Sequence, residues 1–180
     1  MRIINGYLSG RRPVLPSRID ARPTTDKARE ALFNILRNRV DFESIRVLDL
    51  FAGTGSISFE FASLGCPDIT AVEWNRHLAD AMRKNLTLLK INSVRLVQSD
   101  VFRFIGRPFG PYDLIFADPP FDHRLINEIP NIILNSNLLN TDGVLILEHG
   151  PTLSFQSHPG WMETRHYGKV NFSFFGINNF

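Results

Sequence analysis

The chain of 180 residues is 43% hydrophobic and 21% charged, the composition of a soluble globular protein with one main domain. Its single cysteine excludes an intrachain disulfide and a thiolate metal cluster, and no apolar run approaches the roughly 18 residues that span a membrane. Residues 1–15 also lack the apolar stretch of a signal peptide, so we expect a cytoplasmic protein, by default a monomer. The net charge is +2.

The first part of the chain is strongly basic. Residues 1–40 hold nine basic and three acidic side chains, a net charge of +6, whereas residues 41–180 have a net charge of −4. Most of these cations are arginines, which suit bidentate contact with phosphate. We therefore expect residues 1–40 to form a basic arm and helix that contact nucleic acid or another polyanion, and residues 41–180 to form the main domain. A solvated arm without a partner is the alternative.

Within the arm, glycines and prolines interrupt any long pattern, so only two short strands are expected, at residues 2–4 and 14–15. Thr24 or Thr25 can cap the helix that follows, where apolar residues recur every three or four positions between residues 28 and 36. That spacing predicts an amphipathic helix docked on the main domain.

Strands and helices alternate from residue 46 onward. We expect strands at 46–50, 69–73, 94–97, 112–117 and 144–147, and helices at 56–64, 76–91, 101–105 and 124–134. Pro130 should interrupt or kink the last helix, and Asp142-Gly143 should form a turn before the fifth strand. Residues 161–175 alternate like an antiparallel hairpin. This order predicts an α/β fold with a doubly wound parallel sheet that a closing hairpin makes mixed.

Polar groups follow the first three expected strands. Gly53-Thr54-Gly55 permits a tight turn and the close approach of a ligand, although Ser58 stands where a third dinucleotide-binding glycine would fall. Glu73 ends the second strand, where an acid can bind both ribose hydroxyls, and Asp100 ends the third, near an adenine edge. Together they predict a nucleoside cofactor, either NAD or S-adenosylmethionine.

The sequence Asp118-Pro119-Pro120-Phe121 follows the fourth strand and distinguishes the two cofactors. A hydride transferase has no evident use for this stiff loop. A methyltransferase that acts on an exocyclic amine can use it, because a carboxylate and a carbonyl can accept hydrogen bonds from the N–H groups of the amine while a ring stacks on the base. No metal is needed for this reaction, and His123 and His149 have no cluster of further ligands at metal-binding spacing.

The combined motifs resemble a known family. Residues 47–55 (VLDLFAGTG) together with Asp118 to Phe121 look like the amino-methyltransferases, and the remaining motifs resemble the RsmD family, which methylates the N2 amine of a guanine in bacterial 16S rRNA. The latter motifs are residues 2–6, 10–11, 22–24, 29–36, 148–149 and 167–168. The resemblance implies a Rossmann-like class I S-adenosylmethionine-dependent methyltransferase with a mixed seven-stranded sheet and a C-terminal antiparallel hairpin.

The resemblance also assigns site residues. Asp118 and Pro119 would bind the target amine, and Phe121 would stack on the guanine of 16S rRNA, either naked or in an assembling small subunit. The cofactor would contact Asp49, Gly53, Gly55, Glu73, Asp100 and Val101. RNA contacts, or an arm closing over the site, would come from Arg11, Arg12, Arg22, Thr24 and Arg29.

Three alternatives remain open from the sequence. The planar amine could be adenine N6 in a nucleic acid or a glutamine amide in a protein. The chain could instead be a non-catalytic RNA-binding assembly factor on a methyltransferase fold, or a nicotinamide oxidoreductase, which Ser58 and the two prolines disfavour.

Overall fold

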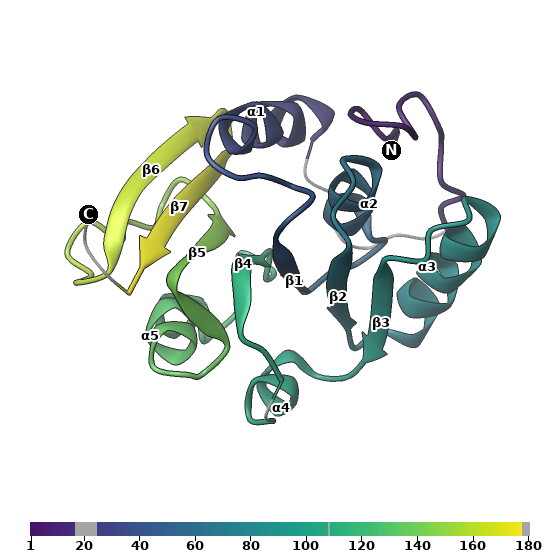
Figure 1. Cartoon of the computed structure of the whole chain (residues 1–180). Coiled ribbons are helices and arrows are strands. Elements are labelled where there is room, and N and C mark those ends of the chain that lie inside the picture. The colour runs from purple at the N-terminus through teal and green to yellow at the C-terminus, as the bar shows by residue number, and fades with distance from the viewer. Residues whose placement is uncertain (17–24, 108, 178–180) are drawn as a thin grey trace.

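The computed structural model describes residues 1–16, 25–107 and 109–177, which are arranged around one sheet (Figure 1). The strand order is β3-β2-β1-β4-β5-β7-β6. The strands are β1 (Arg46–Leu50), β2 (Asp68–Glu73), β3 (Val94–Gln98), β4 (Tyr112–Ala117), β5 (Leu139–His149), β6 (Trp161–Tyr167) and β7 (Val170–Gly176). The first five are parallel, whereas β7 is antiparallel to β5 and β6. The predicted mixed sheet of seven strands with a C-terminal hairpin is confirmed.

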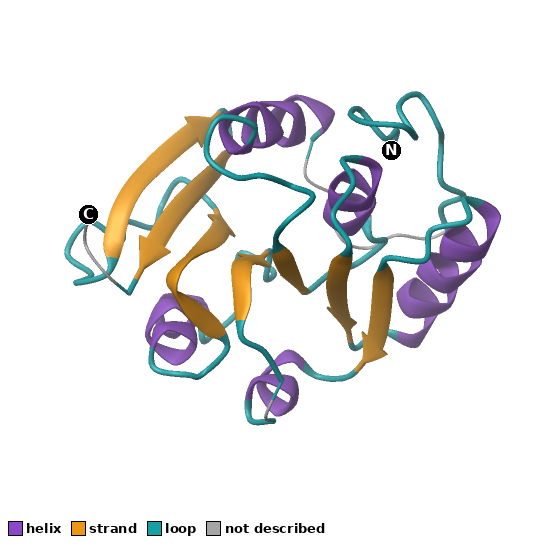
Figure 2. Ribbon diagram, viewed as in Figure 1, coloured by secondary structure: helices purple, strands orange, loops and turns teal. Residues whose placement is uncertain are grey.

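Helices cover both faces of the sheet, as the ribbon coloured by secondary structure shows (Figure 2). They are α1 (Asp26–Leu36), α2 (Ser56–Ser63), α3 (Arg76–Leu88), α4 (Val101–Ile105) and α5 (Ile129–Leu134), with a 3-10 turn at Ile126–Glu128. The first three pack on one face, and α4 and α5 pack on the other. None of the helices in the described part of the chain is long and apolar enough to cross a membrane.

The strands are apolar on both sides because both faces of the sheet are covered. In β1, Val47 joins the cluster under α1 and α2, while Leu48 and Leu50 join the cluster under α4 and α5. Phe33 of α1 meets Phe61 of α2 edge to face in the first cluster, with ring centroids 4.9 Å apart. The helix predicted near residues 28–36 therefore contributes directly to the core.

The strand order reverses between β1 and β4. Chain segments leave these two neighbouring strands toward opposite sides of the sheet, which opens a crevice at their carboxyl ends. The glycine loop follows β1 and Asp118 follows β4, so the fold brings the two halves of the predicted site together.

Several local predictions were wrong. Residues 2–4 form no strand; Ile3 instead exchanges backbone hydrogen bonds with Gly10 and Arg11 outside the sheet. Pro130 lies in the first turn of α5, where the missing N–H costs nothing, so it does not kink a longer helix. Asp142 and Gly143 lie inside β5, at an irregularity in its pairing with β4, so they do not form the turn expected before the strand.

Candidate active site

The carboxyl ends of β1, β2 and β4 lie side by side. Leu50, the last residue of β1, is paired in register with Val72 of β2 and with Ala117 of β4. The residues that follow these positions therefore emerge at one level of the sheet. They include the glycine loop, Glu73 and Asp118, which the sequence had assigned to one site.

The two glycines of the loop have different roles. Gly53 and Gly55 both adopt positive φ, at 57° and 84°. A Cβ built on Gly55 would lie 2.9 Å from Cε of Met82, so this glycine lets α2 pack closely against α3. A Cβ built on Gly53 would meet no atom nearer than 3.9 Å, so the space in front of it is open to a ligand. The loop thus fits a cofactor that approaches the backbone at Gly53.

Glu73 is buried and ties the loop to the end of β2. Its carboxylate accepts hydrogen bonds from Gly53 N at 2.8 Å and from Asn75 N at 2.6 Å. Each carboxylate oxygen has a second lone pair, so both can still accept a bond from a ribose hydroxyl. Trp74, the next residue, is 68% exposed beside this carboxylate. Sequence reasoning missed Trp74, although a large aromatic residue directly after the ribose-binding acid was a visible signal.

Asp100 and Val101 begin α4. The Asp100 side chain is exposed and caps the helix by accepting a bond from Arg103 N at 3.0 Å. The Val101 side chain is buried in the core under α4, so a contact with the cofactor would have to use its backbone amide.

Asp49 lies inside β1 and faces α2. Ser58 donates to its Oδ2 through both Oγ at 2.5 Å and the backbone N at 3.1 Å. Burial disfavours the charged carboxylate and raises the pKa of Asp49 to about 7, and the bonds from Ser58 oppose this shift. Ser58, which departs from the dinucleotide pattern, therefore joins α2 to the strand below it.

The loop after β4 presents a carboxylate, a carbonyl and a ring. Asp118 N donates to Leu50 O at 3.3 Å, which joins the loop to β1. Pro119 is buried, whereas the ring of Phe121 is 45% exposed. A Cβ on Gly150, after β5, would come within 3.1 Å of that ring, so Phe121 rests on bare backbone there. The ring is therefore supported on one side and open on the other.

Three rings join the loops of the site. His123 stacks on Phe102 of α4, with centroids 5.5 Å apart and planes 22° apart, and Phe51 meets His123 edge to face at 5.9 Å. Phe51 has a φ of 61°, a strained conformation that concentrates at functional sites. The His123 amide also closes the loop by donating to Pro120 O at 2.8 Å. Sequence reasoning gave His123 no role, because this stack joins separate loops.

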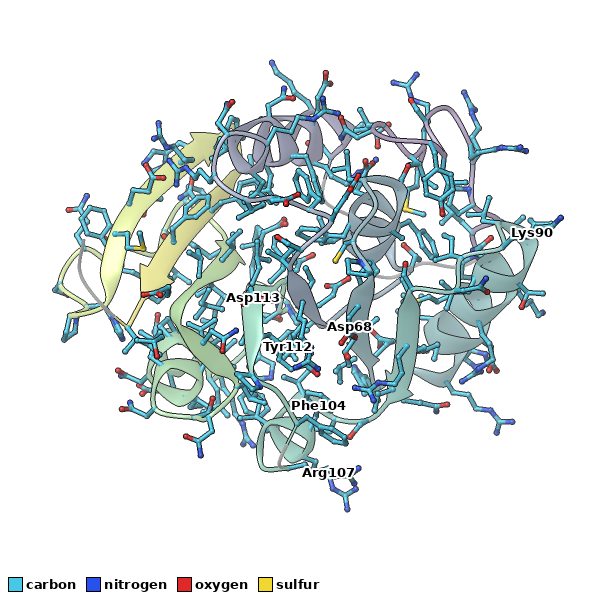
Figure 3. All side chains as sticks on the ribbon, in the orientation of Figure 1. Asp68, Lys90, Phe104, Arg107, Tyr112 and Asp113 are labelled. Atoms are coloured by element: carbon cyan, nitrogen blue, oxygen red, sulfur yellow. The ribbon has the colours of Figure 1, made fainter. Side chains whose placement is uncertain are left out.

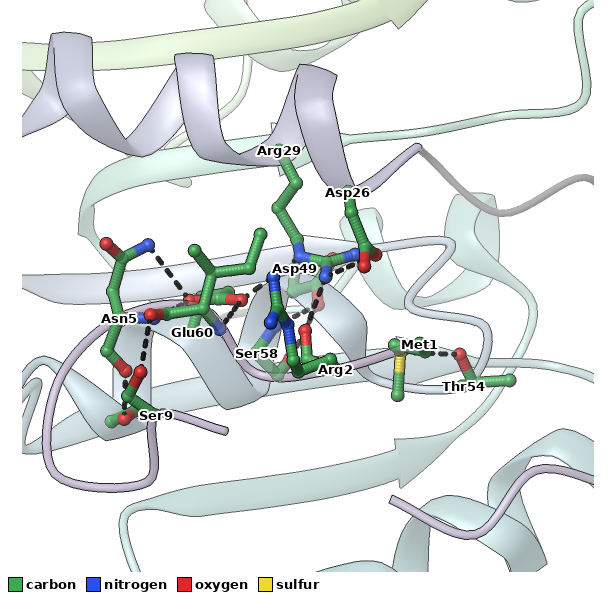
Figure 4. Close-up of polar contacts among 12 residues, drawn as sticks. Met1, Arg2, Asn5, Ser9, Asp26, Arg29, Asp49, Thr54, Ser58 and Glu60 are labelled. Atoms are coloured by element: carbon green, nitrogen blue, oxygen red, sulfur yellow. Dashed lines mark hydrogen bonds and ion pairs between the residues drawn. The ribbon is translucent and has the colours of Figure 1, made fainter. Parts of the chain in front are cut away.

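One arginine predicted to contact RNA is buried. Arg29 is 1% exposed, and its guanidinium bonds Glu60, Asp26 and the carbonyl of Arg2 at 3.1, 2.9 and 2.6 Å (Figure 4). The prediction that Arg29 contacts RNA is therefore wrong, because its guanidinium forms an internal ion pair between α1 and α2.

The other arm residues fall into two groups. Arg11 and Arg12 are exposed. Arg22 and Thr24 lie outside the described residues.

Further along the chain, His149 is buried between Gly150 O at 2.9 Å and Ser173 Oγ at 2.8 Å, and it joins β5 to β7. Among the described residues, no group of three or more His, Cys, Asp or Glu could hold a metal.

Comparison with known proteins agrees with this geometry. The family model described as conserved hypothetical protein 95 matches residues 1–176. The ribosomal RNA small subunit methyltransferase D of Escherichia coli K12 is 33% identical over 148 residues, which cover 82% of this chain and 74% of that protein.

Solved structures show the same fold. A putative methyltransferase, YhhF, from Escherichia coli superposes with a TM-score of 0.85 at 28% identity, over 100% of this chain and 99% of that one. A 16S rRNA N2-guanine methyltransferase from Thermus thermophilus, solved with AdoMet and guanosine, has a TM-score of 0.71 at 21% identity and covers 86% of this chain and 44% of that one. The chain therefore belongs to the conserved hypothetical protein 95 family, the RsmD family, and has the class I methyltransferase fold.

Proposed function

We propose that this protein transfers a methyl group from S-adenosylmethionine to the N2 amine of a guanine in small-subunit ribosomal RNA. The observation that carries the proposal is the meeting, at the switch point of the sheet, of the glycine loop and Glu73 with Asp118-Pro119-Pro120-Phe121. Membership of the family supports methylation of ribosomal RNA as the reaction. The aromatic and proline-rich loop supports a planar amine as the acceptor.

The residues of the crevice fit S-adenosylmethionine, which when bound supplies a methyl group activated by its sulfonium. The open space before Gly53 admits a ligand to the backbone, and Glu73 has lone pairs left for the ribose hydroxyls. Asp100 and the Val101 amide would hold the adenine end. Asp49 and Gly53 would shape the pocket for the methionine end, as in a cofactor site at the carboxyl ends of parallel strands.

Asp118, Pro119 and Phe121 would act on the guanine. The Asp118 carboxylate and the Pro119 carbonyl accept hydrogen bonds from the two N–H groups of the amine. These bonds turn the nitrogen lone pair out of conjugation with the ring. The Phe121 ring stacks on the base and fixes its plane, since it is supported by Gly150 on its other side. The catalytic contribution is orientation of the reacting nitrogen, and the carboxylate lies at hand for the proton that the nitrogen loses.

The test is the identity of the methylated nucleoside. The protein would be incubated with labelled S-adenosylmethionine and either naked 16S rRNA or small-subunit particles from cells that lack the modification, and the RNA digested for mass spectrometry. We expect N2-methylguanosine. N6-methyladenosine would overturn the assignment of the amine, and cofactor binding without any transfer to RNA would overturn the proposed activity.

A further inference from the structure

The beginning of the arm is held on two helices by side chains that bond its backbone. Ser63, at the end of α2, accepts a bond from Leu8 N at 2.8 Å. Asn85, in the last turns of α3, accepts from Val14 N at 2.8 Å and donates to Val14 O at 2.9 Å. Ser63 and Asn85 are both buried, so the segment from residue 7 to residue 14 has one defined position. We call this segment the arm loop.

The arm loop lies at the edge of the sheet opposite the candidate active site. Helices α2 and α3 follow β1 and β2 and run back antiparallel to them, so both helices end at the amino ends of the strands. Figure 1 shows the arm descending onto α3. Figure 3 shows Lys90, just after α3, at one side of the molecule and Arg107, after α4, at another.

This edge exposes side chains that the fold does not use. The Tyr7 ring, at the start of the arm loop, is 68% exposed, and Leu88 of α3 is also exposed. Four exposed cations, none with an ion pair among the described residues, share the surface: Arg11, Arg12, Lys84 and Lys90. Asp80, an acid on the same helix, is already paired with Arg76 and Arg83.

A hollow of about 450 Å³, which Lys90 helps to line, lies between the end of α3 and the start of β3. Its lining combines two cations, two uncharged polar residues and an apolar floor, and no acidic residue contributes. The residues are Arg83, Lys90, Thr87, Asn92, Leu86, Ile91 and Val94. Cations at the rim of an apolar hollow suit a phosphate together with the face of a sugar or a base.

Stabilisation of a helix end explains only part of this pattern. Lys90, just after the C-cap of α3, lies where a cation favours the C-terminal dipole of that helix. Arg11 and Arg12 belong to no helix, however, and an exposed Tyr7 ring adds nothing to the core. A polyanion with flat bases satisfies all of these groups, because phosphates pair with the cations and a base stacks on the tyrosine.

We propose that the arm loop and the end of α3 form a second RNA-binding surface, which grips substrate RNA away from the methylated guanine. The inference rests on the proposed function, since RNA is the substrate there. It predicts that the RNA footprint extends from the carboxyl-end crevice around α2 and α3 to the opposite edge of the sheet.

The test compares two double variants with equal loss of charge. Arg12→Ala/Lys90→Ala removes one cation from the arm loop and one from the hollow, whereas Lys27→Ala/Lys169→Ala removes exposed cations from α1 and from the turn between β6 and β7. Binding of labelled 16S rRNA would be measured across a series of salt concentrations. We expect the first variant to bind about tenfold more weakly, with a salt slope less steep by about 1.5, from two lost phosphate contacts. Equal affinity and slope for the two double variants would overturn the surface.

A third variant tests stacking. Tyr7→Ala should weaken RNA binding by about fivefold or more and leave the salt slope unchanged, because a base contact releases no counterions. Unchanged affinity in Tyr7→Ala would remove the ring from the surface. Thermal unfolding and titration with S-adenosylmethionine should match the unmodified protein in each variant.

The two proposals can fail separately. If the protein methylates no ribosomal RNA but Arg12→Ala/Lys90→Ala still loses RNA affinity relative to the control, the surface stands and the proposed function falls. If rRNA is methylated, naked RNA binds all variants equally and only the reaction on assembled particles slows, the partner at this edge is a protein of the particle, and the RNA surface is refuted.

Discussion

Replacing Asp49 by asparagine should remove a pH dependence that burial builds into the folded protein. The carboxyl lies between β1 and α2 with a pKa of about 7, against an ordinary value near 3.8. The folded protein therefore holds a proton between about pH 4 and pH 7 that the unfolded chain has lost. Because the folded state binds more protons in this window, the free energy of unfolding falls as the pH rises through it.

The size of the effect follows from the pKa. Each unit of pKa difference corresponds to about 1.4 kcal/mol. Between pH 5 and pH 7 the free energy of unfolding should therefore fall by about 3 kcal/mol because of Asp49, and above pH 7 this contribution levels off. The amide introduced by Asp49→Asn resembles the protonated carboxyl in shape and cannot ionise. The free energy of unfolding of Asp49→Asn minus that of the unmodified protein should therefore rise by about 3 kcal/mol from pH 5 to pH 8.

Urea unfolding followed by circular dichroism at four pH values measures this difference. Any constant penalty from the new amide donors cancels in the comparison across pH. Ser58→Ala is a useful companion, since losing the hydroxyl bond that favours the charged carboxylate should move the window to higher pH. A difference between Asp49→Asn and the unmodified protein that stays constant from pH 5 to pH 8 would refute the reasoning.

Three further predictions concern the loops and the arm. Titration with S-adenosylmethionine should change the tryptophan fluorescence, and Trp74→Phe should abolish the change, because the chain's other tryptophan is on β6; a persisting signal would contradict this placement. His123→Ala should lower kcat up to about tenfold by removing the stack on Phe102, and His123→Phe should retain much of the original kcat. Equal rates for the two variants would show that the ring at position 123 does not affect catalysis. Glu60→Gln should lower the free energy of unfolding by about 3 kcal/mol in urea, since it removes the buried carboxylate that pairs with Arg29 and leaves only the half-exposed Asp26 to balance the guanidinium; a change below 1 kcal/mol would argue against that pair.

The succession of strands and helices was predictable because the strands are covered on both faces of the sheet. Strands such as β4 therefore read as continuous apolar runs, and each ends at a polar group that marks the ligand edge. Asp142 and Gly143 show the limit of that reading. Both residues favour turns, but β5 pairs with β4 on both sides of the irregularity and so continues through them. Local propensity carries no information about such pairing.

The position of a candidate site residue was predictable where it follows from the end of one strand. It was less predictable where segments distant in the sequence meet. Asp118 and Glu73 could be placed because each lies at the carboxyl end of a strand. Arg29 resembled the exposed arginines around it, but its partner Glu60 lies 31 residues later, on α2. The stack of His123 on Phe102 likewise depends on how the loop after β4 folds against α4. Composition and spacing carry no information about such contacts.

The most direct test of the central claim is single-turnover methyl transfer to small-subunit particles by Asp118→Ala, with Asp122→Ala as the matched control from the same loop. Asp122 is exposed, two residues beyond the Asp118-Pro119-Pro120 segment. We expect Asp118→Ala to lower the transfer rate about 100-fold or more while affinity for S-adenosylmethionine stays within about threefold, and Asp122→Ala to transfer normally. Transfer by Asp118→Ala at the rate of the unmodified protein would contradict it.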